Sequence, residues 1–228
     1  MGKALVVAPR FDDATGYSYE WSREIVDWLK TALYDVVDLG GRTVGRSEVE
    51  GELKKNFELY VHYNHGSEDC HWGSSVEKVV DLQNDSLLGG KEVYCMNCLS
   101  ASKLGRDAVK NKGCVAYYGY TDVFAFSTDA LDYFKTLANA GLKYRLCGYS
   151  WQQVVSMVKQ LAETLVEELY NAGKFIAASA IQHDADVLVC WEPGHVSNSW
   201  IDNLVGAVRK FIEWIRRVIG EKRRSSVS

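Results

Sequence analysis

The chain has 228 residues, of which 47% are hydrophobic, and a formal net charge of -4. This length fits one large domain with a substantial buried core, and we expect a single domain over residues 1–228. The acidic balance excludes the overall basic field that attracts proteins to nucleic acid, so no nucleic-acid partner is expected.

Apolar runs along the chain are short. Residues 4–8 form a run shorter than the core of a signal peptide, and no segment reaches the roughly 18 apolar residues that span a bilayer. We therefore expect a soluble, cytoplasmic protein that does not bind membranes. The six cysteines do not require a disulfide framework in a chain of this length, and most are expected to be buried free thiols.

Strand and helix patterns alternate along the first half of the chain. Short apolar runs predict strands at residues 4–8, 35–39, 57–63, 92–97 and 114–118. Helical spacing predicts helices at residues 19–33, 47–55 and 101–111, with Ser47 as the cap of the second. Between His65 and the fourth strand we expect an irregular loop. The alternation predicts an α/β fold with right-handed crossovers.

The second half of the chain is less regular. Residues 151–170 carry one apolar stripe and predict a long helix, and residues 186–191 predict a late strand. A final helix at about 200–219, followed by a flexible tail at 221–228, completes the expected elements.

The candidate site consists of two side chains that follow neighbouring strands. His65 follows the third strand and Cys98 follows the fourth, and such positions project into one crevice of a parallel sheet. An imidazole can accept the proton of a thiol, which makes Cys98 a candidate nucleophile and His65 its general base. The backbone N–H groups of Gly66 and Cys98 are candidate oxyanion donors. This chemistry needs no metal or cofactor.

Two short motifs resemble the caspase-like fold of cysteine peptidases (clan CD), which includes gingipains, clostripain and CHAT-domain proteins. They are Asn64-His65-Gly66 and the apolar run that leads to Cys98. The resemblance implies a three-layer sandwich with a mostly parallel sheet of core order 2-1-3-4. It also implies cleavage of peptide or protein substrates by a Cys98–His65 dyad. Asn97, Cys95 and the short interval between His65 and Cys98 depart from the family pattern.

A peptidase that prefers Arg or Lys before the cleaved bond needs a carboxylate in its pocket to pair with the positive charge. Asp122, which follows the fifth strand, resembles the region that builds this pocket in clostripain-like relatives, and Glu68 and Asp69 are rival carboxylates. Asp122 also suits a turn that satisfies its own backbone. Lys103 and Arg106 are weaker candidates for trapping an acidic side chain.

Two other functions fit the same residues. The crevice can hold a peptide without turnover, which would make the chain an interaction module. Cys95-x-x-Cys98 also resembles part of a zinc or redox site, with further possible ligands nearby at His62, His65, Cys70 and His71. Strand positions three apart point to opposite faces, which disfavours a shared metal. The oligomeric state cannot be inferred from the sequence.

Overall fold

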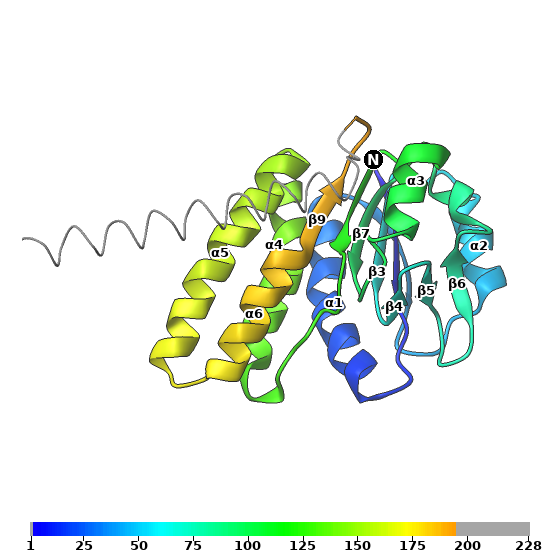
Figure 1. Cartoon of the computed structure of the whole chain (residues 1–228). Coiled ribbons are helices and arrows are strands. Elements are labelled where there is room, and N and C mark those ends of the chain that lie inside the picture. Colours follow the sequence, from blue (N-terminus) through cyan, green and yellow to red (C-terminus); the bar gives the residue numbers. More distant parts are fainter. Residues whose placement is uncertain (1, 195–228) are drawn as a thin grey trace, which may run out of the picture. The chain divides into compact units, whose positions relative to one another are not determined.

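The computed structural model describes residues 2–194, and a six-stranded sheet lies at the centre of this part of the chain (Figure 1). The strands are β1 (Lys3–Ala8), β2 (Asp35–Gly40), β3 (Leu59–Tyr63), β7 (Glu92–Met96), β8 (Ala116–Tyr120) and β9 (Leu188–Trp191). Their order is β2-β1-β3-β7-β8-β9, and only β9 runs antiparallel to its neighbour. The predicted α/β class and the core order 2-1-3-4 are confirmed, with β7 as the fourth strand.

Helices cover one face of the sheet. They are α1 (Asp13–Thr31), α4 (Leu131–Leu146), α5 (Trp151–Asn171) and α6 (Phe175–Val187). Trp21, Phe134 and Val158 pack from this layer against Val6 and Tyr118 of the strands in one apolar core. The opposite face carries α2 (Arg46–Leu53), α3 (Leu104–Lys112) and a second, three-stranded sheet (Figure 1). The three-layer arrangement follows from a sheet that is buried on both faces.

Helix α1 begins six residues earlier than its apolar spacing predicts. Asp12 is its N-cap: Asp12 Oδ1 accepts a hydrogen bond of 2.8 Å from the Thr15 N–H, and Thr15 Oγ1 accepts one of 2.9 Å from the Asp12 N–H. This reciprocal pair satisfies two N–H groups that have no partner within the helix. The capping box therefore fixes the start of α1 directly after the loop that follows β1.

The segment after His65 is ordered, so the expectation of an irregular loop is wrong. It forms β4 (Gly66–Ser67), β5 (Cys70–Trp72) and β6 (Lys78–Asp81), followed by the short 3-10 helix η1 (Asp85–Leu88). Cys70, His71, Val79 and Val80 are buried. Burial of these side chains stabilises a segment whose strands are too short to give a clear period in the sequence.

Helix α2 differs from its prediction in the cap. The helix begins at Arg46 with Gly45 as N-cap, and no side chain caps it, so the assignment of Ser47 as cap is wrong. The Arg46 N–H instead donates to Glu77 Oε1 at 2.9 Å, from a residue 31 positions away. A tertiary contact has replaced the local cap.

The remaining elements complete the layer of helices. The predicted helix at 151–170 is confirmed as α5, which starts with a capping box between Ser150 and Gln153. The 3-10 helix η2 (Thr128–Ala130), α4 and α6 were not predicted. No helix within residues 2–194 is long and apolar enough to cross a membrane. The predicted helix at 200–219 and tail at 221–228 lie outside the described residues.

Candidate functional site

The carboxyl ends of β1, β3, β7 and β8 lie at one edge of the sheet because these strands are parallel. Tyr63 and Met96 are register partners at the ends of β3 and β7, and the Asn64 N–H donates to the Met96 carbonyl at 3.3 Å. The residues that follow, His65 and Cys98, therefore leave the sheet side by side.

The segments that carry His65 and Cys98 are in direct contact. A Cβ atom at Gly66 would lie 2.5 Å from the Cys98 carbonyl oxygen and 3.0 Å from Cγ of Asn97, so only glycine fits there. His65 and Cys98 line the same cavity, which has a volume of about 250 Å³. The structure thus brings together the two predicted catalytic side chains and the predicted oxyanion glycine.

His65 is oriented by a carboxylate that the sequence analysis missed. Asp12 Oδ2 lies 2.8 Å from His65 Nε2, and both side chains are about half exposed. Burial opposes ionisation of Asp12, but the hydrogen bonds from the Thr15 N–H and His65 outweigh it and lower the pKa of Asp12. The imidazole therefore faces an ionised carboxylate, which leaves Nδ1 as its other reactive nitrogen. An aspartate in the loop after β1, three residues before Thr15, was the available signal.

The Cys98 thiol is half-buried. Its Sγ lies 3.9 Å from the Phe124 carbonyl oxygen, and within residues 2–194 no hydrogen bond joins it to the His65 imidazole. Burial, together with the charges of Asp184 and Asp122, raises the pKa of the Cys98 thiol. Cys98 is therefore a protonated thiol at neutral pH and needs a base to become a nucleophile.

The loop around Cys98 has a fixed backbone. Leu99 adopts a left-handed conformation with φ 62°, and its N–H donates to the Asp122 carbonyl at 2.9 Å. The Ser100 hydroxyl donates to Asn97 Oδ1. Among residues 2–194 the Cys98 N–H has no acceptor, which leaves it available to a ligand oxygen.

Behind the loop, on the opposite face of the sheet, lies a buried cluster of polar aromatic side chains. His62 and His71 stack with ring centroids 4.5 Å apart, and His71 Nε2 lies 2.6 Å from the Tyr117 hydroxyl and 3.4 Å from Cys95 Sγ. Asn97 Nδ2 lies 2.9 Å from His62 Nδ1. Burial lowers the pKa of His62 to about 3 and that of His71 well below its ordinary value. Both rings are neutral and structural.

The described part of the chain contains no group of side chains that would support the zinc hypothesis. No three His, Cys, Asp or Glu side chains there are arranged to hold a metal ion. Cys95 is buried with His71 on one face, whereas Cys98 lines the cavity with His65. The two sulfurs of Cys95-x-x-Cys98 are thus in different environments.

The three carboxylates proposed for a basic-residue pocket lie outside the cavity beside Cys98. Asp122 is exposed and accepts a hydrogen bond of 2.7 Å from the Val123 N–H. Glu68 pairs with Lys103, and Asp69 lies 3.3 Å from Lys78. Each carboxylate already has a partner in the structure.

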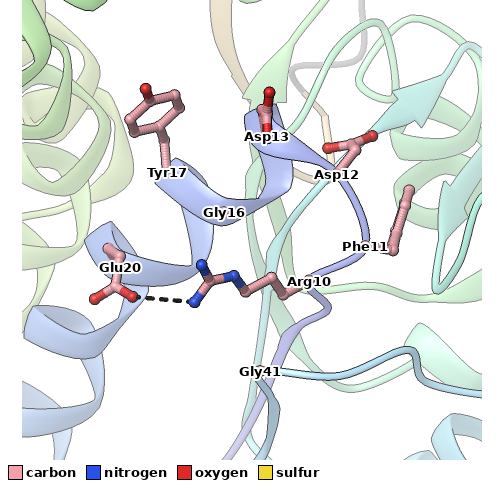
Figure 2. Close-up of a pocket in the computed structure, with 8 residues that line it drawn as sticks. All are labelled: Arg10, Phe11, Asp12, Asp13, Gly16, Tyr17, Glu20 and Gly41. Atoms are coloured by element: carbon pink, nitrogen blue, oxygen red, sulfur yellow. Dashed lines mark ion pairs between the residues drawn. The ribbon is translucent and has the colours of Figure 1, made fainter.

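A second cavity, of about 610 Å³, lies beside the first turn of α1. Figure 2 shows Arg10 and Glu20 facing each other across it, and their ion pair measures 3.6 Å. Asp12 and Asp13 also line it, so its surroundings are charged. Asp12 therefore lines the charged cavity and bonds His65, which lines the cavity that contains Cys98.

Comparisons with known proteins bear on the fold alone. No protein-family model matches the chain, and no curated protein matches it. Among solved structures, the chain is similar to one in the complex of the Porphyromonas gingivalis RgpB pro- and mature domains, with a TM-score of 0.58 and 10% sequence identity. The match covers 84% of this chain and 47% of that one, so the present chain spans about half the length of its structural neighbour. RgpB is a gingipain, and the likeness supports the caspase-like architecture expected from the sequence.

Proposed function

We propose that the protein is a cysteine endopeptidase in which Cys98 is the nucleophile and His65 the general base. The observation that carries the proposal is that Asp12, His65 and Cys98 lie together at one sheet edge, with the imidazole hydrogen-bonded to the carboxylate. A thiol, a base and a group that orients the base are the components of a nucleophilic site. The fold shared with RgpB agrees with this chemistry.

The reaction starts with transfer of the Cys98 proton to His65 Nδ1. Sulfur then attacks the peptide carbonyl carbon, and the N–H groups of Gly66 and Cys98 hold the resulting oxyanion. The imidazolium gives its proton to the leaving amine as the C–N bond breaks, which leaves an acyl thioester on Cys98. Water, deprotonated by the same imidazole, releases the carboxylic acid and restores the thiol.

Asp12 stabilises the imidazolium that forms in this sequence. Its carboxylate faces Nε2 at 2.8 Å and fixes the ring so that Nδ1 is free for proton transfer. The thiol starts from a raised pKa, so His65 must act as a base during attack and not merely stabilise a preformed thiolate.

The experiment is cleavage of a diverse peptide library by wild type, Cys98→Ala and His65→Ala, followed by mass spectrometry. Wild type is expected to cut, and both variants are expected to lose at least 10³-fold in kcat/KM. Retention of full cleavage by both variants overturns the proposal. The predicted preference for a basic residue stays a prediction, and loss of such a preference in Asp122→Ala would support it.

A second candidate is a peptide-binding module without turnover. It is favoured by the thiol contact with the Phe124 carbonyl in place of one with His65. Catalytic contacts are often long before substrate binds, so this geometry fits both functions. Peptides that bind wild type and Cys98→Ala equally, without being cut by either, would identify the module.

A further inference from the structure

We propose that the cavity beside Cys98 accepts an apolar side chain of the substrate. This side chain belongs to the residue that supplies the carbonyl group of the bond that is cut. This inference rests on the proposed peptidase function and names its substrate class. It starts from the cavity of about 250 Å³ that His65 and Cys98 line together.

Apolar side chains form most of the cavity wall. Met96 comes from the end of β7, and Val123, Phe124 and Phe126 come from the segment after β8. Ala14 adds a methyl group from the first turn of α1. Burying an apolar group of a ligand against such a wall removes apolar surface from water and therefore favours binding.

The polar residues in the wall are satisfied within the protein. The Ser18 hydroxyl donates to the Thr15 carbonyl at 3.2 Å, and the Thr15 hydroxyl donates to the Asp12 carbonyl at 3.0 Å. The Asn64 amide donates to the Pro9 carbonyl at 3.1 Å, and both ends of the Asn97 amide are engaged with His62 and Ser100. These groups offer little to a polar side chain of a ligand.

No lysine, arginine, aspartate or glutamate within residues 2–194 lines this cavity. A basic or acidic side chain would lose its hydration there without gaining a partner of opposite charge, which is unfavourable. Asp122 and Asp184 influence the Cys98 thiol but do not line this cavity, and Arg10, Asp12 and Glu20 line the neighbouring cavity of Figure 2. Charge therefore selects against Arg, Lys, Asp and Glu beside Cys98.

The volume fits one side chain. Pockets for drug-sized ligands and cofactors occupy roughly 300–1,000 Å³, whereas an apolar cavity of about 150 Å³ holds a benzene ring. A cavity of about 250 Å³ is large enough for leucine, methionine or phenylalanine. It is small for a cofactor.

The wall is fixed relative to the nucleophile. Phe126 packs edge-on against Trp21 with ring centroids 5.5 Å apart, and Phe124 packs against Tyr120 at 4.9 Å. The Phe124 carbonyl contacts Cys98 Sγ, and the Ala125 N–H donates to the buried Asp184 at 2.9 Å. A side chain seated in the cavity would consequently hold its own carbonyl close to the thiol.

The test uses peptidyl chloromethyl ketones that differ only in the residue next to the ketone, on the full chain carrying Cys147→Ser to remove the exposed thiol. The readout is the rate of Cys98 labelling by intact mass. Reagents with Leu or Phe are expected to label at least tenfold faster than those with Arg or Asp. Equal rates, faster labelling by Arg or Asp, or no labelling at all would overturn the inference.

A charge variant sharpens the result. Val123 is 47% exposed and lines the cavity, so Val123→Asp is expected to fold and to shift labelling towards Arg by at least tenfold. Val76→Asp places the same charge on a residue that is 86% exposed and outside the cavity, and should leave the order unchanged. Asp122→Ala should also leave it unchanged, whereas a basic-residue pocket at Asp122 would lose its Arg preference.

Failure of the inference and failure of the proposed function give different results. Labelling reports the thiol and the cavity without requiring turnover, whereas library cleavage reports catalysis. Cleavage that depends on Cys98 and follows Arg, Lys, Asp or Glu would retain the peptidase and discard the apolar cavity. Labelling with the expected order but without any cleavage would retain the apolar cavity and discard the peptidase.

Discussion

Gly66 lies so close to the Cys98 backbone that any larger residue at position 66 must push apart the two segments that carry His65 and Cys98. The contact is to a carbonyl oxygen of the backbone and not to the end of a flexible side chain, so it cannot be relieved by a rotamer change. The close approach of the segments that carry His65 and Cys98 therefore requires a residue without a Cβ atom at position 66.

Gly66→Ala is expected to reduce kcat/KM for peptide cleavage by on the order of 10²-fold, because a displacement of about 1 Å in a catalytic site costs that much. Gly51→Ala is the matched control, since a Cβ at Gly51 meets nothing within 4 Å. Steady-state kinetics and thermal unfolding of both variants separate misplacement from instability. A wild-type rate in Gly66→Ala would show that the contact does not position the site.

Asp12→Asn is expected to keep α1 intact and to lower kcat. Asparagine is as good an N-cap as aspartate, so the hydrogen bond from the Thr15 N–H survives. The amide cannot stabilise an imidazolium as a carboxylate does, and a loss on the order of 10²-fold or more in kcat follows. Asp13→Asn removes the same charge one residue away and serves as the control. Equal rates in the two variants would remove Asp12 from the mechanism.

Alkylation of Cys98 is expected to be slow at neutral pH and to accelerate at alkaline pH, because burial raises the pKa of its thiol above the ordinary value of 9.0. The rate of iodoacetamide labelling against pH, measured by mass spectrometry in Cys147→Ser, checks this. A plateau that begins below pH 7 would instead indicate a preformed thiolate paired with imidazolium.

Asp184→Asn is expected to stabilise the fold, increasingly as pH rises from about 4 to 8. Burial raises the pKa of Asp184 to about 8, so the folded state keeps a proton that the unfolded chain releases above about pH 4. Stability of the wild type consequently falls across this window, by on the order of a few kcal/mol, and the neutral amide avoids that loss. Denaturant unfolding at several pH values measures the difference. Parallel pH profiles for the two proteins would contradict the assignment.

Much of the sheet could be predicted because its strands are buried on both faces and read as continuous apolar runs. Positions His65 and Cys98 followed from those runs, since parallel strands bring their carboxyl ends together. The three-stranded sheet after His65 could not be predicted, because β4 and β5 hold two and three residues and show no period. Their stability comes from burial against the main sheet.

Asp12 escaped prediction for a different reason. Its partner His65 lies 53 positions away, and nothing local to either residue indicates the pair. The capping box with Thr15 was readable, and it would have placed a carboxylate at the crevice edge. The apolar cavity wall was equally inaccessible, because Met96 and Phe126 meet only through the tertiary fold.

The stacked rings of His62 and His71 limit the stability of the neighbouring Cys98 loop at low pH. Nε2 of His62 bonds the Trp72 carbonyl at 3.1 Å and must donate, so Nδ1 must accept from the Asn97 amide that immediately precedes Cys98. Protonation would turn that acceptor into a donor. As pH falls from about 6.5 towards 3, His62 binds a proton in the unfolded chain but stays neutral in the folded protein. The free energy of unfolding therefore decreases over this range. In acid, the protein would thus lose stability through these buried histidines, and the change at Asn97 would disturb the backbone next to Cys98, the proposed nucleophile.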